Sequence, residues 1–269
     1  METEATILAQ ANDTIQAQQA LSRDSSEPKL IRKTIAQRVA ELASMPVEPK
    51  PTQEQLERDA ERRRRETIEQ ARLQRQGALK DLLSRVGRRY HGCTLENYQA
   101  DTGPQQLALE NVRAYIARID ENVKQGRGAL MFGPPGTGKD HLAVAIMRAA
   151  VDSGAKVEWT DGSDFYGAVR DNIDGDKTEA AFLKRFTSPD MLVVSDPLPP
   201  VGAVNSGFQL SMLFRIIDRR YRDLKATVMT LNVATRKEAE DRLSPNIVDR
   251  LAHGAMAIHC NWPSYRRGN

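Results

Sequence analysis

A chain of 269 residues has room for one large domain or two ordinary ones, and a hydrophobic content of 40% is enough to build a core. Aromatic residues make up only 5% of the chain, so that core must be mostly aliphatic, and a net charge of +3 is too small to predict nucleic-acid binding by itself. We expect a cytoplasmic protein, because no apolar run approaches the roughly 18 residues of a membrane helix and the first residues do not resemble a signal peptide. Cys93 and Cys260 match no metal-ligand spacing and are expected to be reduced thiols.

The first fifty residues are poor in large apolar side chains. Residues 1–28 therefore predict disorder or a marginal helix. Between Leu30 and Leu42, apolar residues recur at steps of three and four, which predicts a short amphipathic helix that docks a partner. Three prolines at positions 46–51 end that helix, so residues 1–51 are expected to be a partner-binding segment and a linker.

A long charged helix is predicted within residues 52–90. Thr52 and Gln55 have the spacing of a capping box at its start. Eleven Lys/Arg and seven Asp/Glu lie between Gln53 and Arg89, with four consecutive arginines at residues 62–65. The pattern fits a solvated helix with ion pairs four residues apart, and it also fits a contact surface for nucleic acid or an acidic partner.

The remainder of the chain, residues 91–269, is predicted to be an α/β domain. After a break at Gly92 and a helical stretch over residues 105–123, short apolar runs alternate with helical stretches. Five strands are expected, at residues 129–132, 157–160, 191–194, 227–231 and 255–259. Helices are expected at residues 139–150, from residue 163, and at 177–186, 209–224 and 245–251. This alternation predicts three layers with a five-stranded parallel sheet, and the few residues after the last strand predict no C-terminal helical lid.

A Gly-rich stretch, Gly133-Pro134-Pro135-Gly136-Thr137-Gly138-Lys139-Asp140, joins the first strand to a helix that continues with His141. Glycines let backbone N–H groups surround an anion, the helix start adds a positive dipole end, and Lys139 supplies a charge for the outer phosphates. A purely structural turn would need all these features to coincide. The sequence therefore predicts that the nine residues from Gly133 to His141 bind ATP. One position departs from the phosphate-loop motif, because Asp140 stands where a Ser or Thr hydroxyl would bind Mg²⁺.

Polar residues follow the third and fourth predicted strands. Ser195 and Asp196 end the third strand, where an acidic pair is expected, and Asp196 is predicted to have a catalytic or metal-binding role. Asn232 follows the fourth strand, where it either forms a turn or reaches the γ-phosphate or attacking water.

Arg250 lies on the short helix before the last strand. An isolated arginine is more often a surface charge. Its place in the order of motifs predicts an arginine finger that acts on the ATP of a neighbouring subunit.

Together these motifs resemble those of the AAA+ ATPases of the DnaC-type helicase loaders and the IstB-type transposition helpers. The stretches that carry the resemblance are residues 133–139, Ser195-Asp196, Thr230-Leu231-Asn232, Asp249-Arg250-Leu251 and Trp262-Pro263-Ser264-Tyr265-Arg266, with Gly92 to Tyr98 ahead of them. The resemblance covers residues 88–267 and those families also lack a C-terminal lid. It implies an ATP-controlled homo-oligomer that handles single-stranded or duplex DNA without sequence preference and engages a larger partner.

Three functions follow from this resemblance. The first expectation is a DnaC-like loader that grips the replicative helicase with its N-terminal segment during DNA replication. The second is an IstB-like helper of transposition, with a transposase as partner. The third is a scaffold that binds ATP without hydrolysing it. The sequence does not separate the first two, because they differ in their partner.

The positions of Asp140 and Ser195 decide whether hydrolysis is expected. In the resembled families the loop supplies a hydroxyl and the strand a carboxylate, whereas this chain has the reverse. We interpret this as a swap in which Asp140, Ser195 and Asp196 bind Mg²⁺, with Asp196 in the place of the water-orienting acid. The alternative is an inactive site in which Asp140 repels the phosphates.

Overall fold

The computed structural model describes residues 37, 40, 51–174, 178–198 and 207–266. The chain divides into two units, Met1–Asp59 and Ala60–Asn269, and each contact described below lies within one of them. The predicted disorder of residues 1–28 lies outside the described residues. The same holds for the short helix predicted between Leu30 and Leu42, apart from two helical positions, Gln37 and Ala40.

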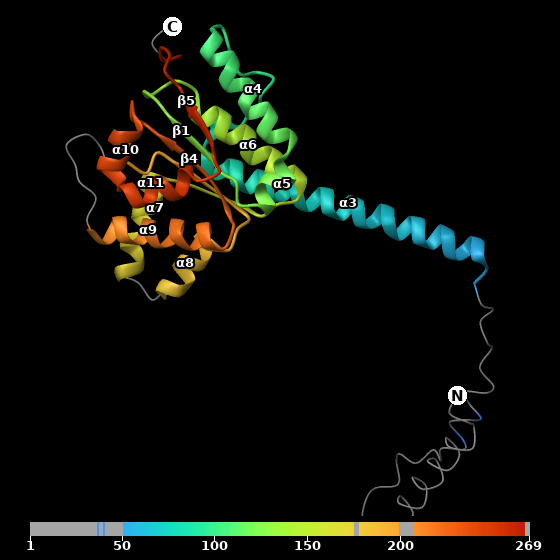
Figure 1. The fold of residues 1–269 in the computed structure, drawn as a ribbon. Coiled ribbons are helices and arrows are strands. Elements are labelled where there is room, and N and C mark those ends of the chain that lie inside the picture. Colours follow the sequence, from blue (N-terminus) through green and yellow to red (C-terminus); the bar gives the residue numbers. More distant parts are fainter. Residues whose placement is uncertain (1–36, 38–39, 41–50, 175–177, 199–206, 267–269) are drawn as a thin grey trace, which may run out of the picture. The chain divides into compact units, whose positions relative to one another are not determined.

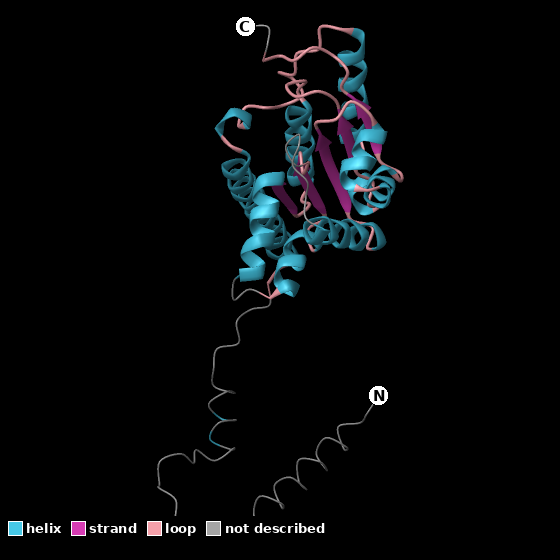
Figure 2. Ribbon diagram, turned by 90° about the vertical axis from the view of Figure 1, so that its left-hand side faces the viewer, coloured by secondary structure: helices cyan, strands magenta, loops and turns pink. Residues whose placement is uncertain are grey.

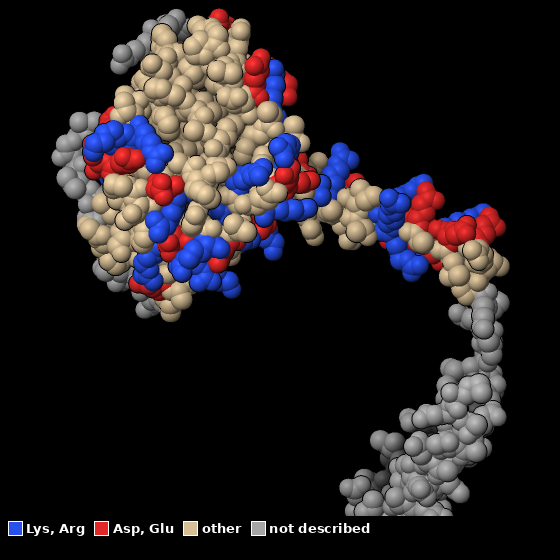
Figure 3. Space-filling model, in the orientation of Figure 1, with Lys and Arg blue, Asp and Glu red and all other residues tan. Residues whose placement is uncertain are grey.

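Helix α3 (Gln53–Val86) begins with the predicted capping box. The Thr52 N–H donates to Gln55 Oε1 at 2.8 Å, and the Gln55 N–H donates to Thr52 Oγ1 at 3.3 Å. Residues 60–70 are all exposed and carry charges of both signs (Figure 3), with ion pairs four residues apart such as Arg65–Glu61 at 2.5 Å. These pairs are those expected of a solvated helix, and each contributes little to stability.

The last turns of α3 pack on the α/β domain. Leu82 is buried there, and Arg85 Nη1 lies 2.6 Å from Glu158 Oε1. Further back along the helix, Arg75 Nη1 donates to the Asp152 carbonyl oxygen at 2.8 Å. The helix is therefore anchored at its C-terminal end and exposed over residues 60–70.

Five parallel strands form one sheet in the order β2-β3-β4-β1-β5, which confirms the predicted architecture (Figure 1). The strands are β1 (Ala129–Phe132), β2 (Val157–Asp161), β3 (Met191–Ser195), β4 (Ala226–Leu231) and β5 (Met256–His259). In the register of β3 and β4, Ser195 lies beside Thr230. Two hydroxyl groups therefore meet near the carboxyl edge of the sheet, where ligands of open α/β sheets bind.

The helices have the following bounds: η1 (Arg88–Tyr90), α4 (Gly103–Ala117), α5 (Ile119–Lys124), α6 (Lys139–Ser153), α7 (Gly162–Asp174), α8 (Glu179–Thr187), α9 (Gly207–Arg222), α10 (Arg236–Leu243) and α11 (Pro245–Ala252). Two of these differ from the prediction. The single stretch expected over residues 105–123 is divided at Arg118, because the buried Asn122 side chain donates to the Tyr115 carbonyl oxygen at 2.9 Å. Helix α10 was not predicted, since only Ala239 and Leu243 of its eight residues are buried.

The two faces of the sheet are covered by different helices (Figure 2). Side chains alternate along a strand, so Ala129 and Met131 pack with α3 to α6, whereas Leu130 packs with the helices from α7 to α11. This is the three-layer arrangement that the alternating pattern predicts.

Arg220, near the end of α9, is fully buried. Its guanidinium donates to five acceptors, which are the carbonyl oxygens of Phe186, Pro189, Asp190 and Ala226 and the hydroxyl of Thr227. Burial lowers the pKa of this guanidinium, and the full set of acceptors compensates for the lost hydration. Arg220 thereby joins α9 to the segments that lead into β3 and β4.

Candidate functional site

The Gly-rich loop lies between the end of β1 and the start of α6. Gly136 and Gly138 both have φ of 85°, in the left-handed region that favours glycine, and Gly138 is the N-cap of α6. A Cβ on Gly136 would come within 2.0 Å of Ser264 Oγ. The loop therefore needs glycine for its backbone conformation and for the close approach of the C-terminal segment, and its N–H groups are placed at a helix N-terminus, where anions bind.

Lys139 is the first residue of α6 and is buried. Its Nζ donates to the carbonyl oxygens of Gly133 and Pro134, both at 2.8 Å. Burial lowers the pKa of this ammonium group. Because both carbonyl acceptors belong to one loop, a phosphate entering the loop can replace them as the partner of the charge.

Asp140 accepts hydrogen bonds from three hydroxyl groups. Ser195 Oγ and Thr230 Oγ1 both donate to its Oδ1 at 2.9 Å, and the Tyr90 hydroxyl donates to its Oδ2 at 3.4 Å. The fold thus brings Asp140 and Ser195, the two departures from the motif, into direct contact. Neither Thr230 nor Tyr90 was predicted to belong to this group.

Asp196 and Asn232 form a second pair beside the first. Asp196 has φ of 42°, a left-handed conformation that its N–H stabilises by donating to the Thr230 carbonyl oxygen at 2.9 Å. Its carboxylate accepts from the Asn232 N–H at 3.1 Å and from the Asn232 side-chain amide. Burial raises the pKa of Asp196 more than these hydrogen bonds lower it, so this carboxylate is a stronger base than an exposed aspartate.

Magnesium would find the Asp140 carboxylate and the hydroxyl groups of Ser195 and Thr230 at this position. Within the described parts of the chain, no three His, Cys, Asp or Glu side chains converge on a common point. That set still fits Mg²⁺, which usually keeps several waters and takes one or two carboxylates together with substrate phosphates. Asp140 and Ser195 would be the protein ligands, and Asp196 lies one residue further along the chain.

Aromatic side chains lie on the other side of the loop. The Tyr98 ring meets those of His141 and Tyr265 edge to face, with centroids 5.2 Å and 6.1 Å apart. His141 Nε2 donates to the Thr94 carbonyl oxygen at 2.7 Å. This half of the site is therefore apolar and partly rigid.

The C-terminal segment fastens the Gly-rich loop from outside. The Trp262 indole donates to the Thr137 carbonyl oxygen at 2.9 Å, and the Tyr265 N–H donates to the Gly136 carbonyl oxygen, also at 2.9 Å. These bonds fix the conformation of the loop without using the N–H groups that would bind an anion.

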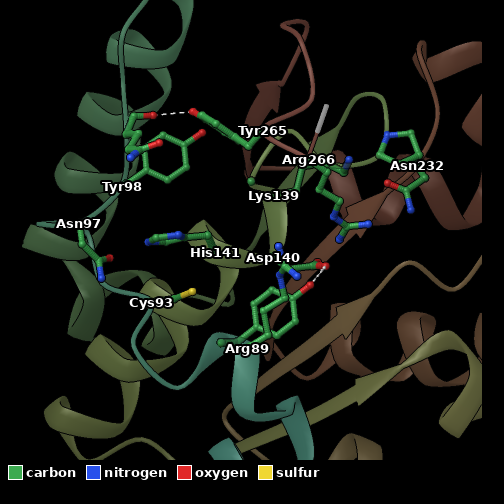
Figure 4. A pocket seen from close by; sticks show the side chains of 15 residues that line it. Arg89, Cys93, Asn97, Tyr98, Lys139, Asp140, His141, Asn232, Tyr265 and Arg266 are labelled. Atoms are coloured by element: carbon green, nitrogen blue, oxygen red, sulfur yellow. Dashed lines mark hydrogen bonds between the residues drawn. The ribbon is translucent and has the colours of Figure 1, made fainter. Parts of the chain in front are cut away.

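A cavity of about 320 Å³ runs between these groups (Figure 4). Figure 4 shows Tyr98, His141, Cys93 and Asn97 on one side and Asp140, Arg89, Arg266 and Asn232 on the other. Its lining is Arg89, Tyr90, Cys93, Asn97, Tyr98, Gln99, Pro135, Gly136, Gly138, Lys139, Asp140, His141, Asn232, Tyr265 and Arg266. An apolar half beside a cationic half suits a base joined to phosphates.

Several predicted residues do not line this cavity. Gly133, Pro134 and Thr137 make hydrogen bonds within the loop. Ser195 bonds to Asp140, and Asp196 bonds to Asn232. Arg250 is elsewhere, on α11, where its Nε donates to Asp218 Oδ1 at 2.9 Å.

Arg266 and Tyr265 were noted in the sequence only as part of the closing motif, and the structure places both in the cavity. Thr230 was likewise noted only as part of a motif. No signal in the sequence indicated its contact with Asp140, which joins residues 90 positions apart.

Residues 43–269 match the family described as IstB-like ATP binding protein. The chain belongs to this family. Like other IstB-like proteins it has an AAA+ fold and binds ATP, and the matched range includes the whole cavity. None of the helices in the described parts of this IstB-like protein is long and apolar enough to span a membrane.

Two relatives named for different roles have similar levels of identity. The replicative helicase loader DnaC of Escherichia coli (strain K12) is 29% identical over 180 residues, covering 66% of this chain and 70% of the relative. A putative insertion sequence ATP-binding protein of Sinorhizobium fredii (strain NBRC 101917 / NGR234) is 31% identical over 180 residues, covering 65% of this chain and 58% of the relative.

Solved structures have the same fold. The crystal structure of the DnaC helicase loader superposes with a TM-score of 0.56 and 26% identity, over 64% of this chain and 99% of that chain. The crystal structure of DnaI superposes with a TM-score of 0.54 at 17% identity, over 66% of this chain and 93% of that chain, and supports the fold alone.

Proposed function

We propose that this IstB-like protein is a cytoplasmic, magnesium-dependent ATPase that loads or remodels a replicative helicase on DNA. The contact between Asp140 and Ser195 carries the hydrolytic part of the proposal, because it brings together a carboxylate and a hydroxyl beside the phosphate-binding lysine. The helicase as partner rests on the similarity to DnaC, whose solved chain is covered over 99% of its length.

The residues of the cavity would divide the work as follows. Lys139 would exchange its two carbonyl partners for the outer phosphates of ATP. Asp140 and Ser195 would hold Mg²⁺, which when bound neutralises charge on the phosphates. Asp196 would orient an attacking water and accept its proton at the carboxylate, and Asn232 would hold that carboxylate in place.

Two further parts of the proposal concern assembly and DNA. We place Arg250 as an arginine finger on the ATP of a neighbouring copy, which makes the active form a homo-oligomer. We also propose non-specific binding of single-stranded DNA, with arginines 62–65 contributing through charge. Such binding would weaken steeply as salt rises.

A double-mutant cycle tests the active site. Under the swap, Asp140→Thr and Ser195→Asp each lower magnesium-dependent ATPase activity, and the pair together restores it, as expected of two ligands that share one ion. Nucleotide affinity measured without magnesium is the control, and it should change little across the cycle.

One result of this cycle would favour a scaffold that binds ATP over an ATPase. If Asp140→Thr alone raises ATPase activity, Asp140 restrains hydrolysis and the swap is refuted. The protein would then bind ATP chiefly to control assembly.

A second candidate function is assistance to a transposase, which the 31% identity to an insertion sequence ATP-binding protein favours. The full chain and a chain lacking residues 1–51 can be compared as baits in the two settings. Recovery of purified helicase by the full chain alone supports the loader. Recovery of a transposase instead supports the second function, and recovery of neither weakens both.

A further inference from the structure

Arg250 is held inside its own chain by three contacts. Its Nε donates to Asp218 Oδ1 at 2.9 Å, its Nη1 donates to the Asn246 carbonyl oxygen at 3.0 Å, and its Cζ lies 5.0 Å from the centre of the Phe214 ring. No described residue accepts a hydrogen bond from its Nη2, and 27% of the side chain is exposed. The guanidinium is therefore held through Nε and Nη1, and its Nη2 donates to no acceptor among the described residues.

Asp218 binds a second arginine at the same time. Arg222 Nη2 lies 2.7 Å from Asp218 Oδ2, on the oxygen that Arg250 does not use, and only 19% of the Asp218 side chain is exposed. One carboxylate shared by two guanidinium groups leaves a net charge of +1. Asp218 therefore positions Arg250, and the pair of arginines keeps a positive charge that can attract an anion.

Arg222 and Arg250 line a hollow of about 560 Å³. Two further cations, Arg127 and Lys225, line it, and each pairs with a carboxylate outside the lining, Glu121 at 3.8 Å and Asp190 at 2.6 Å. Figure 3 shows Lys and Arg side chains over α9, the helix that carries Arg222, with Asp and Glu side chains among them.

This hollow lies at the amino edge of the sheet, since its lining includes Gly128, just before β1, and Thr227, near the start of β4. The Gly-rich loop lies at the carboxyl edge, beyond the four residues of β1, which span about 13 Å. The Arg250 side chain contacts Asp218 and Phe214 of α9. In the proposed function, the phosphates that it serves belong to another copy of this chain.

We propose that Asp218 is the positioning residue of the arginine finger. Asp218 and Phe214 fix the plane of the Arg250 guanidinium, so its Nη2 can be presented to the neighbour's γ-phosphate without a search among rotamers. Arg222 occupies the second carboxylate oxygen and keeps the site positive. This inference rests on the proposed ATPase function.

The test is Asp218→Asn in the full chain. ATPase activity of the assembled protein should fall by about tenfold, while ATP affinity and Tm stay nearly unchanged, because the finger acts on the neighbour's transition state. In an Arg250→Ala background, Asp218→Asn should not lower ATPase activity further. Asp218→Glu alone should retain part of the activity. Asp223→Asn is the matched control, since Asp223 lies close by and pairs with the exposed Arg219 at 2.6 Å.

Mixed assemblies separate positioning from simple stability. Asp196→Asn copies should bind ATP without hydrolysing it and still offer an intact Arg250, whereas Asp218→Asn copies have an intact ATP site. A mixture should therefore exceed the mean activity of the two separate proteins. Activity equal to that mean, or a Tm loss that accounts for the whole effect of Asp218→Asn, overturns the positioning role.

The failure of this inference is distinguishable from failure of the proposed function. If Arg250→Ala abolishes ATPase activity and Asp218→Asn does not change it, only the role of Asp218 is wrong. If Arg250→Ala itself has no effect, the finger is wrong, and if wild-type protein does not hydrolyse ATP, the proposed function is wrong.

Discussion

Lys139 in the Gly-rich loop and Arg220 in α9 are both buried cations. Both donate hydrogen bonds to uncharged oxygen atoms, but the segments that supply these acceptors differ. The main partners of Lys139 are two carbonyls of one loop, and it lines a cavity. Arg220 binds five acceptors that lie on separate segments leading into β3 and β4. A cation whose partners belong to one loop can exchange them for a ligand, whereas one that joins several segments holds the fold together.

The largest effect is expected at Arg220. Arg220→Met would leave several buried carbonyl groups without a donor, so the free energy of unfolding should fall by about 3–5 kcal/mol. Urea unfolding measures this loss, with Arg219→Met as the control, since 63% of that side chain is exposed and its pair with Asp223 is a surface ion pair. A loss below about 1 kcal/mol would mean that Arg220 does not hold the fold together.

Lys139→Ala should have the opposite signature. We expect ATP affinity to fall by about 100-fold or more, because no other residue of the loop offers a charge to the β- and γ-phosphates, while Tm changes little. Binding of a fluorescent ATP analogue measures the first effect, and exposed Lys184 supplies the control substitution Lys184→Ala. If Lys139→Ala binds ATP with unchanged affinity, the Gly-rich loop is not the ATP site.

The smallest effect is the pH dependence of ATPase activity, which extends the comparison from the two buried cations to a partly buried carboxylate, Asp196. Asp196 accepts a proton only when ionised, and burial raises its pKa, so ATPase activity should be lost as the pH falls through a value above the ordinary aspartate pKa of about 3.9. A kcat profile against pH measures this acidic limb, and Tm at each pH excludes unfolding. Asp196→Asn should abolish the limb together with most of the activity. An unaltered profile in that variant would contradict the role of Asp196 as the base.

The order of elements was largely predictable because it depends on local patterns. Strand β1, the Gly-rich loop and α6 follow one another within 25 residues, and each leaves its own signal in periodicity or composition. The capping box at Thr52 is equally local. Helix α10 was not predicted because its sequence is mostly charged. The division at Arg118 was not predicted because it depends on one buried side chain, Asn122.

The sequence by itself determined the fold class, the phosphate-binding loop and the polar residues at the strand ends, because each follows from neighbours along the chain. Only the tertiary structure decided which of them touch. Asp140 meets Thr230 across 90 positions, and Arg250 meets Asp218 across 32. Such contacts depend on strand order and on how α9 and α11 pack, and no local pattern encodes them.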